Sequence, residues 1–239
     1  MGEDHQKPSS LSPLKLAIPT VVIASLAGMC GWWLLRAHSD ELGAKQKLAE
    51  LGALVAMDAD GRHVGTVTFS TIKGVSKTRE ALEIVSTLGQ VKAIDLNRTA
   101  IDNSDLTSLA KCTSLVSLSL KSTAIDDSGL SALAGLRQLE SLHLNDTAVS
   151  DAGLPHLAKL TNLKLLDLSG TQVASDLAPI SELPQLEWLV LCRLTLEEDA
   201  VRTLGHAPAL RRLTLRSTEV NDSAVEELQK TRPDLSLDE

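Results

Sequence analysis

Apolar and polar residues recur in the same order along most of the chain. Each copy follows the pattern L-x-x-L-x-L-x-x-T-x-[IV], and successive copies begin 23 or 24 residues apart. The six clear copies begin at Val91, Leu115, Leu139, Leu163, Leu186 and Leu210. A weaker copy precedes them near Val64, and Leu235 with Leu237 begins an incomplete last one. A repeat of this length indicates an array of stacked units rather than one globular core.

Each copy predicts a strand followed by a short helix. Residues 139–144 (LESLHL) alternate apolar and polar side chains, which is typical of a short strand with one buried face. Leu154, Leu157 and Leu160 then recur at every third residue, the spacing of one face of a short α- or 3₁₀-helix. A unit this small cannot bury its leucines alone, so neighbouring copies must stack and share a continuous core. The predicted fold class is therefore α/β.

Five segments that follow the strands share the motif T-x-[IV]-x-D-x-G-L or a near match to it. They are TAIDNSDL at Thr99, TAIDDSGL at Thr123, TAVSDAGL at Thr147, TQVASDL at Thr171 and TEVNDSAV at Thr218. Through these motifs, residues 64–239 resemble bacterial leucine-rich repeats of about 24 residues. The resemblance implies a curved leucine-rich-repeat solenoid, with a parallel sheet on its concave side, short helices on its convex side and a protein partner on the sheet.

The best-known form of this family has Asn where these five copies have Thr. We expect the threonine hydroxyls to bond backbone groups in the turns while their methyl groups pack in the core. One copy breaks the column, because Leu194 stands in the Thr position and Leu196 in the following apolar position. We expect that copy to be locally irregular.

The chain begins with a polar tail, residues 1–15, followed by an uncharged apolar run over residues 16–35. Twenty such residues are about the length at which a helix crosses a bilayer, and Trp32 and Trp33 stand at the end of the run, where indole rings favour the membrane interface. A cleaved signal peptide is the alternative, although its apolar region is usually shorter. We predict a retained single-pass transmembrane anchor, with the solenoid outside the cytoplasm by similarity to bacterial repeat proteins that carry one.

Residues 39–63 are predicted to cap the N-terminal end of the solenoid, where an apolar layer must be covered. An N-cap signal at Ser39 and leucines at helical spacing (Leu48, Leu51 and Leu54) predict a helix. The Asp-Gly pair in the following MDADGRHV predicts a hairpin turn. At the other end, a last helix stopped by Pro233 and a short strand form the C-terminal cap of the solenoid.

The amino-acid composition and net charge argue against several classes of function. Only 2% of the 239 residues are aromatic, so Leu, Val, Ile and Ala must build the core. The formal net charge of -8 argues against a nucleic-acid partner, because Lys and Arg carry affinity for phosphates. Cys112 and Cys192 lie in copies about three apart, too distant for a disulfide. The sequence has no phosphate loop, Gly-x-Ser-x-Gly elbow, CxxC pair or H-E-x-x-H motif, so we expect no cofactor, no metal and no catalysis.

One pair of residues keeps an enzymatic alternative open. His143 and Asp167 occupy the same outward strand position in successive copies, so they are expected about 4.8 Å apart across the sheet. Such a pair could serve a hydrolase as general base and orienting carboxylate. No nucleophile is evident beside them in the sequence, and we interpret the pair as solvated polar side chains.

The outward strand positions change in character along the solenoid. The early copies carry small polar residues there, and the later copies carry large apolar ones beside arginines. The predicted protein-binding residues are Leu165, Trp188, Val190, Arg193, Arg212 and Arg216. An exposed aromatic residue beside arginines is typical of a binding hot spot, and the arginines favour an acidic partner. The alternative is that Trp188 leans onto a neighbouring strand and the arginines form a solvated edge.

Together these features predict a non-catalytic protein-interaction module, a monomeric solenoid displayed at the cell membrane by the anchor at residues 16–35. A second hypothesis is an intracellular adaptor, because T-x-I-x-D-x-G-L repeats also resemble those of substrate receptors in ubiquitin ligases. The segment before the repeats does not resemble the helical F-box of such receptors.

Overall fold

A computed structural model describes residues 40–238 of the chain. The predicted tail and transmembrane anchor, residues 1–15 and 16–35, lie outside the described residues. Between residues 40 and 238, no helix combines the length and the apolar character that crossing a membrane requires.

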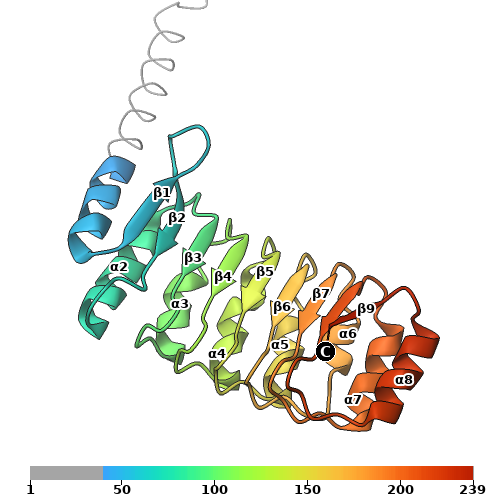
Figure 1. Ribbon diagram of the computed structural model, residues 1–239. Helices are drawn as coiled ribbons and strands as arrows, with labels where there is room; N and C mark the ends of the chain where they lie inside the picture. The colour runs from blue at the N-terminus through green and yellow to red at the C-terminus, as the bar shows by residue number, and fades with distance from the viewer. Residues whose placement is uncertain (1–39, 239) are drawn as a thin grey trace, which may run out of the picture. The chain divides into compact units, whose positions relative to one another are not determined.

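Residues 40–238 form nine strands joined side by side in chain order into one sheet (Figure 1). The first two, β1 (Leu54–Met57) and β2 (Val64–Thr68), pair antiparallel, and each later strand pairs parallel with the one before it. The later strands are β3 (Ala93–Asp95), β4 (Ser117–Ser119), β5 (Ser141–His143), β6 (Leu165–Asp167), β7 (Trp188–Val190), β8 (Arg212–Thr214) and β9 (Ser236–Asp238).

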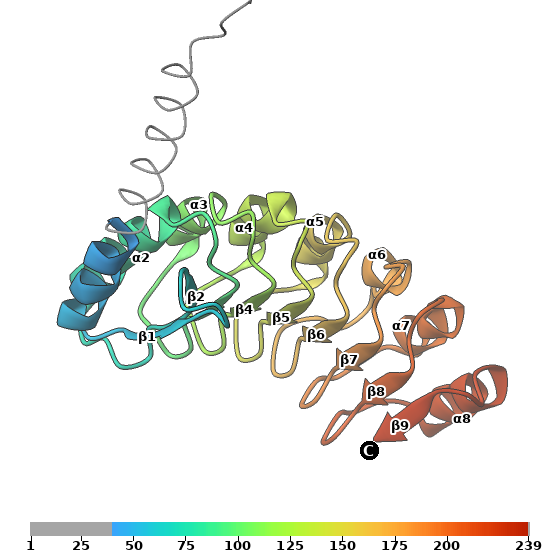
Figure 2. The same ribbon diagram turned by 90° about the horizontal axis from the view of Figure 1, so that it is seen from above.

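Helices connect successive parallel strands, and a further helix covers residues 40–51. The α-helices are α2 (Val75–Thr87), α3 (Leu106–Leu109), α4 (Asp127–Leu130), α5 (Leu154–Leu157), α6 (Ala178–Ser181), α7 (Glu198–Thr203) and α8 (Asp222–Thr231). The 3₁₀-helices are η1 (Asn103–Asp105), η2 (Ser131–Gly135), η3 (Asp151–Gly153) and η4 (Leu204–His206). Figure 2 shows the strands along the inner side of the curve and the helices along its outer side. The solenoid expected from the repeats is therefore confirmed.

The register of the sheet follows from the repeat length. Each central strand residue pairs with its equivalent one copy later, as Leu142 does with Leu166, and Leu166 with Leu189. These leucines are fully buried, and so are Leu154, Leu157 and Leu160 on the helical side. Burying one such side chain contributes roughly 1.5–3 kcal/mol, so leucines repeated in every layer supply the continuous core.

The threonine hydroxyls form hydrogen bonds with backbone carbonyls in the turns, as expected. In four copies the threonine Oγ1 donates to the carbonyl oxygen three residues earlier, for example Thr147 to Leu144 at 2.6 Å. In the copy where Leu194 replaces threonine, Thr218 of the next copy donates to the carbonyl of Leu191 instead. Strand β7 keeps its register with both neighbours, so the strand itself is regular. The difference lies in the segment after it, where the hydrogen bond is exchanged and the backbone bridge that other copies form with the preceding copy is absent between residues 40 and 238.

The D-x-G-L part of the motif joins neighbouring copies on the edge between strand and helix. The Asp127 carboxylate accepts hydrogen bonds from the backbone N–H of Ser150 in the next copy, at 2.7 Å, and from its Oγ, at 2.6 Å. A Cβ atom added at Gly153 would lie 2.4 Å from Asp127 Oδ1. The glycine of one copy therefore leaves the space through which the aspartate of the previous copy reaches.

The N-terminal cap agrees with prediction in part. Leu48 is fully buried on the helix over residues 40–51, and the Asp-Gly pair forms the turn between β1 and β2, with Gly61 at φ +67°. Leu54 does not continue the helix as we expected. It begins β1, where its side chain is 61% exposed, because Gly52 at φ +96° ends the helix just before it.

Candidate functional site

The outward side chains of the strands form two columns along the inner face of the sheet. The first column runs Ala93, Ser117, Ser141, Leu165, Trp188 and Arg212. The second runs Asp95, Ser119, His143, Asp167, Val190 and Thr214. The face therefore changes from small and polar at β3–β5 to large and apolar at β6–β7, in the order predicted from sequence.

Trp188 is half-buried and held by two contacts with the neighbouring strand β8. The Arg212 guanidinium lies over the indole ring, 4.9 Å from its centroid, and Trp188 Nε1 donates to Thr214 Oγ1 at 3.2 Å. Leu165 on β6 is the register partner of Trp188 and is also half-buried. Trp188 thus leans onto a neighbouring strand, as the alternative interpretation expected, while part of its ring remains accessible beside two aliphatic side chains, Leu165 and Val190.

The other two predicted arginines are neutralised within the chain. Arg193 Nη2 lies 2.6 Å from Asp146 Oδ1, two copies earlier, and the pair crosses Gly170, where a Cβ would lie 2.7 Å from that oxygen. Arg216 Nη2 donates to both carboxylate oxygens of Asp238, which raises the pKa of the arginine. Within residues 40–238, Arg212 is the predicted site arginine that forms no ion pair.

His143 and Asp167 are register partners, and their closest polar atoms, Nδ1 and Oδ2, are 3.8 Å apart. Burial raises the pKa of Asp167, but the neighbouring His143 and hydrogen bonds from Ser169 outweigh it, so the pKa is lowered and the carboxylate stays ionised. Ser141 Oγ lies 3.2 Å from His143 Nε2, a neighbour that the sequence reasoning missed, although serine two residues before histidine on a strand must share its face.

This serine, histidine and aspartate lack two features of a nucleophilic catalytic site in this structure. The His–Asp separation is longer than a hydrogen bond. The backbone N–H of Ser141, which could otherwise stabilise an oxyanion, donates to the carbonyl of Val116 within the sheet. The arrangement is that of polar side chains on the inner face of the sheet.

A shallow hollow of about 400 Å³ lies on the early part of the inner face. It is lined by Thr66, Ala93, Ile94, Asp95, Asn97, Ser117, Ser119, Lys121, His143, Asn145 and Asp167. We call it the polar hollow. It adjoins the apolar region, because Asp167 is the register partner of Val190.

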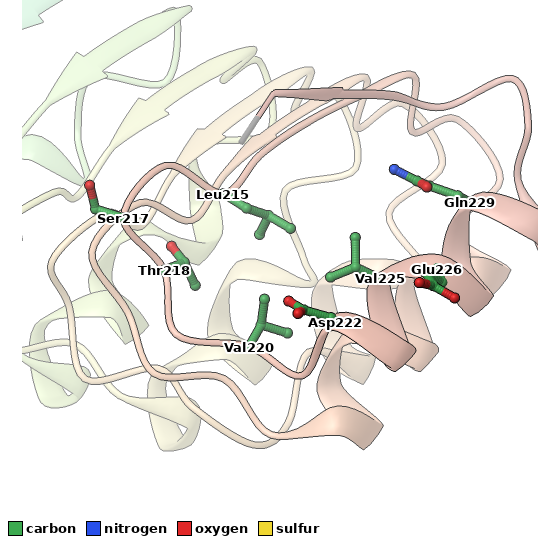
Figure 3. Close-up of a pocket in the computed structure, with 8 residues that line it drawn as sticks. All are labelled: Leu215, Ser217, Thr218, Val220, Asp222, Val225, Glu226 and Gln229. Carbon is green, nitrogen blue, oxygen red and sulfur yellow. The ribbon is translucent and has the colours of Figure 1, made fainter.

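A second hollow, of about 460 Å³, lies at the C-terminal end of the solenoid beside α8 (Figure 3). Leu215, Val220 and Val225 point into it, with Asp222 and Glu226 of α8 at its rim. In earlier copies the equivalent residues contact the next copy. For example, the backbone N–H of Leu196 donates to the carbonyl of Glu219 in the copy that follows. The position of this hollow therefore follows from the repeat geometry.

Comparison with known proteins agrees with this architecture. The family profile described as Leucine Rich repeat matches residues 111–134. No curated protein matches the chain. Among solved structures, an internalin C2 of Listeria monocytogenes is similar, with 21% identity, a TM-score of 0.58, and 84% of this chain and 92% of that one covered.

Two further bacterial structures are similar over a smaller part of their own length. An internalin (inlF) of Listeria monocytogenes has 22% identity and a TM-score of 0.52, with 75% of this chain and 54% of that one covered. A leucine-rich-repeat protein of Leptospira interrogans has 19% identity and a TM-score of 0.51, with 68% of this chain and 50% of that one covered. The chain thus spans about half the length of these two, and the likenesses show its leucine-rich-repeat fold.

Proposed function

We propose that the protein is a non-catalytic interaction module that binds a protein partner on the inner face of its sheet. The partner contacts a patch formed by Leu165, Trp188, Val190 and Arg212, which we call the Trp188 patch. The observation that carries this proposal is the partly exposed indole of Trp188, fixed beneath the Arg212 guanidinium and beside the two aliphatic residues Leu165 and Val190. Aromatic and arginine side chains held together in this way are typical of binding hot spots.

The contacts that hold Trp188 favour binding. A side chain already fixed by a cation–π contact and a hydrogen bond loses little conformational freedom when a partner covers it. The patch also lies on a sheet whose strands are in continuous register, so its members keep their spacing. Both features lower the entropic cost of association.

The charge of the Trp188 patch supports a partner surface with fewer acidic groups than the sequence suggested. Arg193 and Arg216 have carboxylate partners within the chain, and we assign them to holding the turns together. Arg212 is left to meet the partner. We therefore propose one acidic group on the partner, placed beside Arg212, in a contact surface that is otherwise apolar.

The predicted anchor at residues 16–35 makes display at a membrane part of the proposal, with a monomeric solenoid on the extracytoplasmic side. The intracellular adaptor is the alternative. Protease added to sealed cells separates the two, because it degrades an extracytoplasmic solenoid and spares an intracellular one. Protection of the solenoid in intact cells, with degradation after lysis, would overturn the proposed location.

Affinity capture from the native cell envelope, with the full chain as bait, tests the patch. The variant is Trp188→Ala with Arg212→Glu. The control is Arg137→Glu, an equal charge reversal at an exposed position outside the patch. We expect one protein to be retained by wild type and by the control and lost by the double variant, with circular dichroism showing that all three fold. Retention by all baits, or capture of no protein by wild type, would refute the patch.

A further inference from the structure

The polar hollow owes its depth to small side chains on the inner face. Between Asp95 and Asp167, the outward positions of β4 and β5 hold Ser117, Ser119, Ser141 and His143, whereas the following strands carry leucine and tryptophan. Three of these four are serines, which rise little above the sheet, so the surface is lower there than at Leu165 and Trp188 on the following strands. The lining residues are almost all polar, so an occupant must satisfy hydrogen bonds.

The side-chain amide of Asn145, which lines the hollow, has no hydrogen-bond partner among the described residues. Only 6% of the residue is exposed, but no buried side-chain nitrogen or oxygen atom of residues 40–238 lacks a partner, so the amide atoms themselves are accessible at the hollow. The side-chain oxygen of the equivalent Asn97, two copies earlier, has partners, because Oδ1 accepts from Ser119 Oγ and from the backbone N–H of Lys121 at 3.1 Å. The free amide of Asn145 is therefore available to a ligand in the hollow.

The neighbouring residues explain why Asn145 differs from Asn97. Where Ser119 offers a hydroxyl donor to Asn97, the equivalent residue for Asn145 is Asp167, whose ionised carboxylate has no proton to donate. The next backbone donor, the N–H of Ser169, is taken by Asp167 Oδ1 at 3.0 Å. One substitution in the repeat, aspartate for serine, therefore leaves a carboxylate and an unused amide side by side at the hollow.

The carboxylates give this region a negative character. Asp95 accepts the backbone N–H of Asn97 at 2.9 Å, and no lysine or arginine between residues 40 and 238 pairs with either Asp95 or Asp167. Lys121 is the one permanent cation among the lining residues, against two carboxylates. A cationic group entering the hollow would therefore meet unneutralised acceptors.

We propose that the polar hollow binds an arginine side chain of the partner, with its guanidinium between the Asp167 carboxylate and the Asn145 side-chain oxygen. Guanidinium fits better than ammonium, because its planar set of N–H donors can serve a carboxylate and an amide oxygen at the same time. The amide N–H₂ of Asn145 is then free to donate to a backbone carbonyl of the partner. This inference rests on the proposed function only in taking the inner face as the partner's side.

Titration of the isotope-labelled full chain with Nα-acetyl-arginine amide, followed by NMR, tests the hollow without the partner. We expect saturable shifts of the Asn145 side-chain N–H₂ signals and of the His143 and Asp167 backbone signals. Nα-acetyl-citrulline amide has nearly the same shape without the charge, so it is expected to bind about tenfold more weakly or less. Equal shifts with both compounds, or shifts confined to other residues, would overturn the proposal.

Two variants complete the test. Asp167→Asn removes the charge and keeps an oxygen that can accept the N–H of Ser169, so we expect a folded protein that binds the arginine compound at least about tenfold more weakly. The control Asp199→Asn removes a carboxylate that is 90% exposed on α7 and should leave binding unchanged. Undiminished binding by Asp167→Asn would show that the carboxylate does not hold the guanidinium.

Failure of this inference is separable from failure of the proposed function. The Trp188→Ala/Arg212→Glu chain should still bind the arginine compound, because neither residue lines the polar hollow. If the compound binds and the cell envelope yields no partner, the arginine site is supported and the proposed interaction module is refuted. If a Trp188-dependent partner is captured and the compound does not bind, the arginine site alone is wrong.

Discussion

The glycine of the D-x-G-L motif is expected to be required for space and not for backbone conformation. Gly153 has φ −81° and ψ −26°, a helical conformation that alanine adopts readily. A Cβ there would lie 2.4 Å from Asp127 Oδ1 and 2.8 Å from Leu130 Cδ1, well inside van der Waals contact. Asp127 cannot retreat without losing its bonds to Ser150, so Gly153→Ala must strain the contact between two copies.

The expected change in the free energy of unfolding follows from two opposing contributions. Overpacking a well-filled site costs about 1–3 kcal/mol, and replacing glycine by alanine at a compatible conformation returns about 0.4–1 kcal/mol through the unfolded state. We expect Gly153→Ala to lower the free energy of unfolding by roughly 1–2 kcal/mol. The matched control is Gly135→Ala, at a site where an added Cβ meets no atom within 4 Å, and it should be neutral or slightly stabilising.

A double-mutant cycle isolates the cause. Urea unfolding of the full chain, followed by circular dichroism, would compare Gly153→Ala, Asp127→Ala and the double variant. Asp127→Ala alone should cost about 2 kcal/mol, because the hydrogen bonds to Ser150 are lost. In the double variant the new Cβ no longer meets a carboxylate, so its cost should fall about 1 kcal/mol below the sum of the single costs. Strict additivity, or a Gly153→Ala chain as stable as Gly135→Ala, would refute the reasoning.

Three further outcomes are expected. Thr147→Val should lower the unfolding free energy by about 1 kcal/mol in urea, since it removes the hydrogen bond to Leu144; an unchanged midpoint would contradict this. Burial raises the pKa of Asp151, but backbone N–H donors of the next copy lower it further. The stability that the ionised carboxylate contributes is therefore present above about pH 4 and is lost on acidification. Asp151→Asn should flatten that loss between pH 5 and 2. Iodoacetamide at pH 8 should modify Cys192 and spare Cys112, whose pKa burial raises to about 11, as peptide mass spectrometry would show.

The repeat pattern predicted the strands and their register correctly, for a physical reason. With 23 or 24 residues between equivalent leucines, only one alignment of neighbouring copies buries every leucine, and a shift by one residue would expose them all. The outward columns follow from that alignment, so the order of Leu165, Trp188 and Arg212 across three strands could be predicted. Four of the five threonine hydroxyls were equally predictable, because each bonds within its own turn, whereas Thr218 bonds the preceding copy.

Contacts between copies were harder to predict, since they depend on which atoms face each other across the stack. The pairing of Arg193 with Asp146 spans two copies and needs Gly170 between them, and no spacing rule signals it. The helix of the cap was predicted to reach Leu54, but the positive φ of Gly52 stops it earlier. The free amide of Asn145 required the partners of Ser169 to be known.

The two regions of the inner face together constrain the partner more than either does alone. Asp167 on β6 and Trp188 on β7 lie on adjacent strands and two residues apart along the strand direction. With about 4.8 Å between strands and about 3.3 Å per residue, the two positions are roughly 8 Å apart. An extended segment of the partner covers that distance in two or three residues. A partner that uses both regions should therefore present an arginine two or three residues from a large apolar side chain, with an acidic residue close by to meet Arg212.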